Sequence, residues 1–126
     1  MKILQVITRS ELGGAQTVVV QLANRLSDKH DVVLVAGEGD GKMWEMVSPR
    51  VTCVRSRYLQ RALSPLQDIR AAIELRRIYR RHKPDIVHLH NIHGHDCDLA
   101  TLFSYFKEKK TKLIWTFHDC WTFTGY

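Results

Sequence analysis

The sequence predicts an α/β fold, a doubly wound, Rossmann-like parallel sheet whose five strands lie in the order 3-2-1-4-5. Short β-branched, apolar runs alternate with longer segments whose apolar residues recur at helical spacing. The strand-like runs are almost continuously apolar, which is typical of a parallel sheet covered on both faces. Right-handed crossovers between successive strands then give the stated order.

The chain opens with a strand, a turn and a helix. Lys2–Thr8 is β-branched and apolar, which predicts a buried strand. Ser10–Gly14 is a predicted turn, in which Gly13 and Gly14 can adopt positive φ at little cost. A helix is predicted from Ala15 to about residue 29, because four apolar residues recur at helical spacing: Val19, Leu22, Ala23 and Leu26.

Two further strands and a short helix follow. Asp31–Gly37 is almost continuously apolar and predicts the second strand, and Glu38–Lys42 is a glycine-rich turn. Met43–Val47 is predicted as a short helix that Pro49 stops. Val51–Val54 is predicted as the third strand.

The next element is a predicted amphipathic helix over 66–82. Pro65 lies at its expected start, where the missing N–H of proline costs nothing, and Pro84 ends it. The apolar residues cover one broad arc, which we expect to lie on the sheet: Leu66, Ile69, Ala72, Ile73, Leu75, Ile78 and Tyr79. The polar arc holds Gln67, Arg70, Glu74, Arg77 and Arg81.

The last predicted elements are a strand, a helix and a strand. Asp85–His90 is the fourth strand, and Lys112–Phe117 is the fifth. Between them a helix is predicted over 97–109, with its inward residues at Leu99, Leu102, Phe103 and Phe106.

Composition is typical of one globular domain and excludes disorder. The 126 residues are 44% hydrophobic and 25% charged. No apolar run is long enough to span a membrane, and the run near Met1 is too short for a signal peptide, so we expect a cytoplasmic protein. The three cysteines form no CxxC pair and are expected to be reduced thiols: Cys53, Cys97 and Cys120.

Ligands of open parallel sheets bind at the carboxyl ends of the strands, near the switch in strand order. Polar and aromatic residues gather in the loops that follow the first, fourth and fifth predicted strands. Gly13 and Gly14 precede a helix N-terminus, whose free N–H groups and dipole suit a phosphate. The same pair also suits a tight turn with no ligand, and the GxGxxG and P-loop patterns are absent.

His88 and His90 stand two apart on a predicted strand and therefore share a face, which suggests a metal site. A metal-dependent hydrolase is therefore one alternative, although such sites need further ligands, which His118 and Asp119 would have to supply. His88 also fits a buried, hydrogen-bonded side chain. A non-catalytic module that binds a nucleotide or sugar is the second alternative.

The segment after the fifth predicted strand carries candidate sugar contacts. His118 and Asp119 can hydrogen-bond hydroxyl groups, or His118 can simply cap the strand. Trp121 and Phe123 lie beyond the strand and are candidates for a stacking platform, whereas core packing is expected of Trp115 within it.

The formal net charge is +6, and much of the excess lies between Arg50 and Lys83. Basic residues there mean a solvated surface or a contact with acidic lipid head groups: Arg55, Arg57, Arg61, Arg70, Arg77 and Arg81. The net charge permits contact with phosphates, nucleic acid or an anionic membrane surface and does not discriminate among them.

Four motifs together resemble the family 4 glycosyltransferases. The chain begins with the strand, Gly-Gly loop and helix of MKILQVITRSELGGAQTVVVQLANRL, and KPDIVHLHN at Lys83–Asn91 is similar to the fourth strand of that family. HLHNIHG and WTFHDCWTFTG resemble a bacterial branch that builds capsule, exopolysaccharide or O-antigen. The resemblance covers essentially the whole chain.

The resemblance implies that residues 1–126 are the N-terminal, acceptor-side domain of a two-domain GT-B enzyme. The C-terminal domain, which would bind the nucleotide-sugar donor, has no counterpart in these residues. Such enzymes pass a sugar to a glycan or lipid-linked acceptor, retain its configuration and need no metal or other cofactor. The implied partners are therefore the nucleotide-sugar donor and a glycan or lipid-linked acceptor. From the basic residues we expect peripheral contact with the inner membrane, and we expect no nucleic acid.

The resemblance also implies roles for single residues. Gly13 and Gly14 match the loop that approaches the donor diphosphate, and His118 matches the histidine that contacts the transferred sugar. Acceptor contacts are expected of Asn91, His93, Asp119 and Trp121, of which the last two belong to the branch motif.

Overall fold

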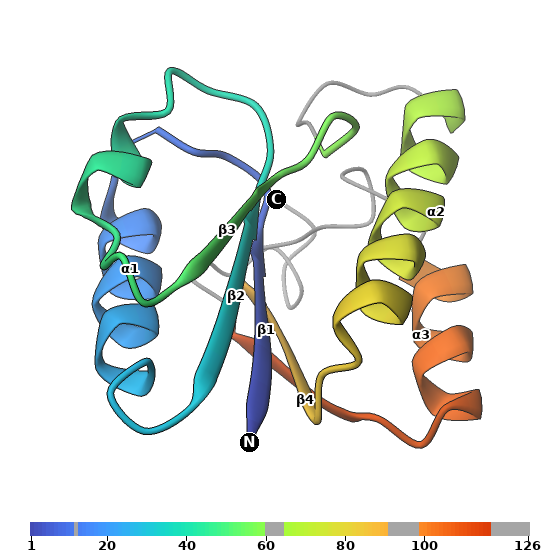
Figure 1. The fold of residues 1–126 in the computed structure, drawn as a ribbon. Helices are drawn as coiled ribbons and strands as arrows, with labels where there is room; N and C mark the ends of the chain where they lie inside the picture. Colours follow the sequence, from blue (N-terminus) through green and yellow to red (C-terminus); the bar gives the residue numbers. More distant parts are fainter. Residues whose placement is uncertain (12, 60–64, 91–98, 117–126) are drawn as a thin grey trace.

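The computed structural model describes residues 1–11, 13–59, 65–90 and 99–116 (Figure 1). They form a five-stranded, wholly parallel sheet in the order β3-β2-β1-β4-β5, as the sequence predicts. The strands are β1 (Lys2–Ile7), β2 (Asp31–Ala36), β3 (Thr52–Arg55), β4 (Ile86–His90) and β5 (Lys112–Thr116). The observed order is that of a Rossmann-like α/β fold.

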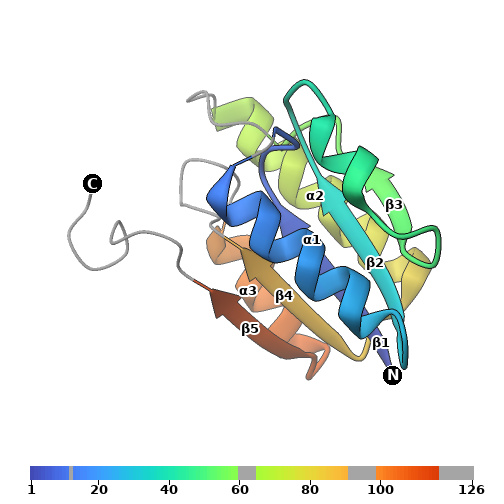
Figure 2. The same cartoon turned by 90° about the vertical axis from the view of Figure 1, so that its left-hand side faces the viewer.

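Helices cover the two faces of the sheet, and β3 and β5 form its edges (Figures 1 and 2). Helix α1 (Gly14–Leu26) and the 3₁₀ helix η1 (Lys42–Met46) lie on one face. Helices α2 (Pro65–His82) and α3 (Leu99–Glu108) lie side by side on the other (Figure 1). Within the described residues, no helix has both the length and the apolar composition of a membrane span.

Each face of the sheet carries its own buried cluster. Alternate residues of β1 point to opposite faces, as the pleat requires. Leu4 and Val6 pack with α2 and α3, whereas Ile7 packs with α1 and η1. The first cluster centres on Leu4, Val6, Val33, Val35, Leu75, Val87, Leu89, Leu102, Tyr105 and Phe106. The second centres on Ile7, Val19, Val20, Ala23, Val32, Leu34, Ala36 and Met43.

The predicted elements are all present, with boundaries shifted by up to about three residues, the largest shift being at the end of α1. Trp115 lies in β5 and packs edge-on against Phe103 of α3, with ring centroids 5.2 Å apart, which confirms its predicted core role. Helices cover both faces of the sheet as expected, but coverage is incomplete at β5, where Leu113 and Ile114 are exposed. An edge strand has a neighbour on one side only, so less of it is covered.

The predicted inward arc of α2 is wrong for three of its seven residues. Leu66, Ile69 and Ile73 are 57%, 50% and 46% exposed. At about 100° per residue they lie on the side of the helix opposite Leu75, which is buried. The apolar residues of α2 therefore form two separate arcs, and only one of them lies on the sheet.

Positive φ occurs in the glycine-rich turn after β2 and is absent from the Gly13–Gly14 pair. Gly39 has φ 139° and Gly41 has φ 77°, which only glycine adopts readily. Gly13 has φ −168°, and Gly14 is already helical, so neither glycine adopts the positive φ that it could tolerate. The reason for two glycines at the start of α1 is thus not backbone strain.

Candidate functional site

The candidate site lies at the carboxyl ends of the strands, where β1 separates β2 from β4 and the strand order reverses. Residues 8–11 and 13 connect β1 to α1 at this edge. Gly13 is the N-cap of α1, and no side chain caps the helix. The first turn also lacks an acidic residue. The first N–H groups of a helix have no partner within it, so this end of α1 can bind an anion.

The two glycines leave space beside that helix end. Both are exposed. A Cβ at Gly14 would meet nothing within 4 Å, and one at Gly13 would meet only the flexible Gln16 side chain. Neither backbone conformation nor packing within the described residues requires glycine here. An approaching ligand would benefit from the missing side chains, which favours the phosphate interpretation over the simple turn.

Backbone hydrogen bonds join the segments after β1 and β2. Gly37 N–H donates to Thr8 O at 2.9 Å, and Ser10 N–H donates to Glu38 O at 2.8 Å. Ser10 O in turn accepts from Met43 N–H at 3.0 Å. The loop that leads to Gly13 is thus fixed to its neighbour, which holds the start of α1 in place.

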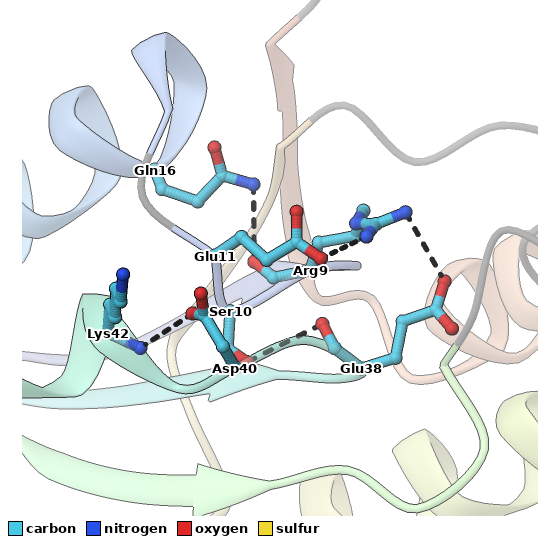
Figure 3. Close-up of polar contacts among 7 residues, drawn as sticks. All are labelled: Arg9, Ser10, Glu11, Gln16, Glu38, Asp40 and Lys42. Carbon is cyan, nitrogen blue, oxygen red and sulfur yellow. Dashed lines mark hydrogen bonds and ion pairs between the residues drawn. The ribbon is translucent and has the colours of Figure 1, made fainter.

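A charged cluster lies over these segments (Figure 3). The Arg9 guanidinium donates to the Glu11 carboxylate and lies 3.7 Å from a carboxylate oxygen of Glu38. The hydrogen bond with Glu11 raises the pKa of Arg9, so the guanidinium stays charged. Gln16 of α1 donates to Arg9 O at 3.3 Å, which ties the helix to the cluster. These three charges sum to −1, so only the helix end favours an anion.

Asp40 organises the glycine-rich turn beside this cluster (Figure 3). Its carboxylate accepts a hydrogen bond from Lys42 N–H at 3.0 Å, at the start of η1. Sequence reasoning missed the whole charged cluster. Arg9 and Glu11 are two residues apart in the sequence, whereas Glu38 lies near Arg9 only because β1 pairs with β2.

His88 and His90 are side by side, with ring centroids 3.7 Å apart. His88 Nε2 hydrogen-bonds the Thr116 hydroxyl at 2.6 Å, and His90 Nε2 hydrogen-bonds the side-chain oxygen of Gln5. Within the described ranges, no three His, Cys, Asp or Glu side chains could together hold a metal. His90 is buried and His88 is half-buried, and both are hydrogen-bonded within the sheet, which favours a structural role for the pair over the hydrolase alternative.

Gln5 was also missed by sequence reasoning. It is a polar residue in the otherwise apolar segment ILQVI, and that interruption is a signal in the sequence for a buried polar contact. The remaining predicted site residues lie outside the described part of the chain: Asn91, His93, His118, Asp119 and Trp121. Phe123, Arg61, Cys97 and Cys120 lie outside it as well, whereas Cys53 is an exposed free thiol.

The sequence matches one protein family over most of its length. The model of Glycosyltransferase Family 4 matches residues 12–126, which include the Gly13–Gly14 pair and every later element of the sheet. No curated protein matches the sequence. The match spans far more than half of the 126 residues, and the observed strand order is consistent with the N-terminal half of a GT-B fold. The chain therefore belongs to glycosyltransferase family 4.

Proposed function

We propose that this chain is the acceptor-side domain of a retaining enzyme that moves a sugar from a nucleotide-sugar donor to a glycan or lipid-linked acceptor. The observation that carries the proposal is the uncapped N-terminus of α1, with two exposed glycines, at the switch point of the sheet. A diphosphate is the part of such a donor that a helix N-terminus suits best. A second, donor-binding domain would complete the site.

The residue roles follow the family resemblance. The N–H groups beside Gly13 and Gly14 would approach the donor diphosphate, and His118 would hydrogen-bond a hydroxyl of the transferred sugar. Asn91, His93, Asp119 and Trp121 would contact the acceptor. The reaction needs no metal or other cofactor in this proposal, so chelators should leave its rate unchanged.

In this proposal the configuration is retained because the acceptor attacks the anomeric carbon from the same face of the sugar from which the leaving group departs. The acceptor oxygen forms a bond to the anomeric carbon while the bond from that carbon to the phosphate oxygen breaks. The acceptor proton passes to the leaving phosphate. A neutral His118 would then stabilise the positive charge that develops on the sugar ring, without acting as a base.

We further propose an acceptor of capsule, exopolysaccharide or O-antigen synthesis, which the resemblance of two motifs to one bacterial branch supports. Lipid-linked acceptors of that kind lie at a membrane. We therefore also propose peripheral contact with the cytoplasmic face of the inner membrane through basic residues. Arg57, Arg70 and Arg77 are exposed, which supports such a contact.

The test is sugar transfer by a protein in which a donor-binding domain follows these residues. Labelled nucleotide sugars would be screened with lipid-linked acceptors, and product stereochemistry would be read by NMR. The 126-residue chain alone should not transfer sugar. Transfer by the short chain, or inversion in the longer protein, would contradict the proposal. Donor binding without any transfer would instead support the non-catalytic module.

Two substitutions in the longer protein test the assigned residues. Gly14→Asp places a carboxylate in the open space at the helix end, where it would repel a diphosphate, and should raise the KM for the donor at least about 10-fold. His118→Ala should lower turnover about 100-fold, the scale of one lost preorganised contact, with an unchanged thermal midpoint. An equal loss of stability and turnover would make His118 structural.

A further inference from the structure

A groove lies between the segment after β3 and helix α2. It has a volume of about 420 Å³ and is lined by Arg57, Tyr58, Arg70, Ile73, Glu74 and Arg77. Its arginines come from two elements, Arg57 from the segment after β3 and the other two from α2. The groove therefore depends on the packing of two separate segments and not on one helix alone.

The groove carries an excess of positive charge. Arg57, Arg70 and Arg77 make no ion pair with any other described residue, although the Arg70 guanidinium lies 5.9 Å from the Tyr58 ring centroid. Glu74 is the one acidic residue of the lining. The planar guanidinium group matches the oxygens of a phosphate, so three of them suit a phosphate ligand.

The Glu74 carboxylate accepts hydrogen bonds from residues 56–58, the segment that forms one wall of the groove. One oxygen accepts from Arg57 N–H at 2.9 Å, and the other hydrogen-bonds the Ser56 hydroxyl and Tyr58 N–H. These bonds fix the segment after β3 against α2. Glu74 therefore holds Arg57 opposite the arginines of α2, and its single negative charge leaves the three arginines in excess.

An exposed apolar row adjoins the groove. Leu66, Ile69 and Ile73 lie on the outer side of α2, and Ile73 also lines the groove. At about 100° per residue, Arg70 and Arg77 fall within the same outward arc. An outward helix face that combines aliphatic and cationic side chains is typical of helices that lie in the interface of an anionic membrane.

We propose that this arginine groove binds the phosphate of an anionic phospholipid head group, while Leu66, Ile69 and Ile73 enter the edge of the acyl region. The inference rests on the membrane contact proposed above and names its surface and ligand. A nucleic acid would match the arginines but not the aliphatic row, and the same holds for free phosphate. Because α2 and α1 lie on opposite faces of the sheet, membrane contact through α2 leaves Gly13 and Gly14 accessible (Figure 1).

The test is co-sedimentation of the 126-residue chain with vesicles of phosphatidylcholine, with and without phosphatidylglycerol. Wild type should bind only the anionic vesicles. The Arg70→Gln/Arg77→Gln variant should bind on the order of 30-fold more weakly, because each basic residue near an anionic surface contributes comparably to binding. Ile69→Gln/Ile73→Gln should also weaken binding. All four side chains are exposed, so the variants should fold, as circular dichroism would verify.

The matched control is Arg25→Gln/Lys29→Gln, which removes the same charge from exposed positions in and just after α1. It should change vesicle binding less than about 2-fold, because these residues would face away from the membrane. Equal losses for the two charge pairs would overturn the groove proposal while leaving general membrane contact intact. Absence of binding to any vesicle would overturn both, and neither result depends on sugar transfer.

Two soluble probes distinguish a lipid head group from free phosphate and from a nucleic acid, which carry the same phosphate group. Inorganic phosphate that raises the thermal midpoint of wild type, without any vesicle binding, would overturn the lipid assignment. A short duplex oligonucleotide that displaces the protein from vesicles at equal phosphate concentration would overturn it in favour of a nucleic acid. Persistence of vesicle binding against both probes supports the proposal.

Discussion

Gln5 of β1 and His90 of β4 hydrogen-bond each other, side chain to side chain, inside the sheet. They are 0% and 1% exposed, so neither can exchange its partner for water. Removing one member of a buried polar pair leaves the other unsatisfied, whereas replacing both by apolar groups of similar size can be nearly neutral. The pair therefore makes a double-mutant cycle informative.

We expect Gln5→Leu and His90→Leu each to lower the free energy of unfolding by about 1–3 kcal/mol. The double variant should lose less than the sum of the two, because it leaves no orphaned member of the pair. Urea unfolding followed by circular dichroism measures all four proteins. Strict additivity would show that the two side chains do not depend on each other.

The sheet could be predicted because each strand and helix has a local sequence pattern that recurs along the chain. Each strand is a short apolar run between helical periods, and the handedness of crossovers then fixes the order. The Gln5–His90 pair joins residues 85 positions apart, so it depends on the register between β1 and β4, which no local pattern encodes. The Arg9–Glu38 contact is missed for the same reason.

Helix α2 shows a second limit of sequence reasoning. The sequence predicts a single inward arc for its apolar residues, yet Leu75 is buried while Leu66 and Ile73 are exposed. Hydrophobicity alone does not say which of two apolar arcs meets the sheet. Of the candidate site, only the Gly13–Gly14 pair lies in the described residues, and its placement at the start of α1 was predicted correctly.

Two glycine substitutions should have opposite effects on stability. A Cβ at Gly37 would lie 2.2 Å from Leu59 O and 2.4 Å from Thr8 O, both backbone atoms, so Gly37→Ala should cost about 3 kcal/mol or more. A Cβ at Gly14 meets nothing within 4 Å, so Gly14→Ala should add about 0.5–1 kcal/mol through helix propensity. Thermal unfolding compares them, and a stable Gly37→Ala protein would refute the close approach.

Lys110 ends the turn after α3 with φ 56°, a left-handed conformation that glycine adopts more easily than lysine. Thr111 N–H donates to Phe106 O at 3.1 Å, as in a helix-terminating Schellman motif. Lys110→Gly should therefore raise the free energy of unfolding by about 0.5–1 kcal/mol. Lys109→Gly is the control, because no positive φ occurs there, and it should not stabilise the protein.

His82, the last residue of α2, should make stability depend on pH. Burial lowers its pKa below the ordinary value, and the charges of Lys2 and Arg81 lower it further. These effects outweigh the C-terminal end of the helix, which by itself favours a cation. Because the unfolded chain binds the proton more readily than the folded one, this contribution to stability is present above about pH 6.5 and is lost as the pH falls.

The thermal midpoint of His82→Gln should therefore fall less than that of wild type between pH 7.5 and pH 5.5. Lys2→Gln removes one of the two neighbouring charges, so its pH dependence should lie between those of wild type and His82→Gln. NMR titration of the His82 ring would measure the lowered pKa directly. Parallel pH profiles for wild type and His82→Gln, or a ring that titrates above its ordinary range, would show that the burial of His82 does not disfavour its charged form.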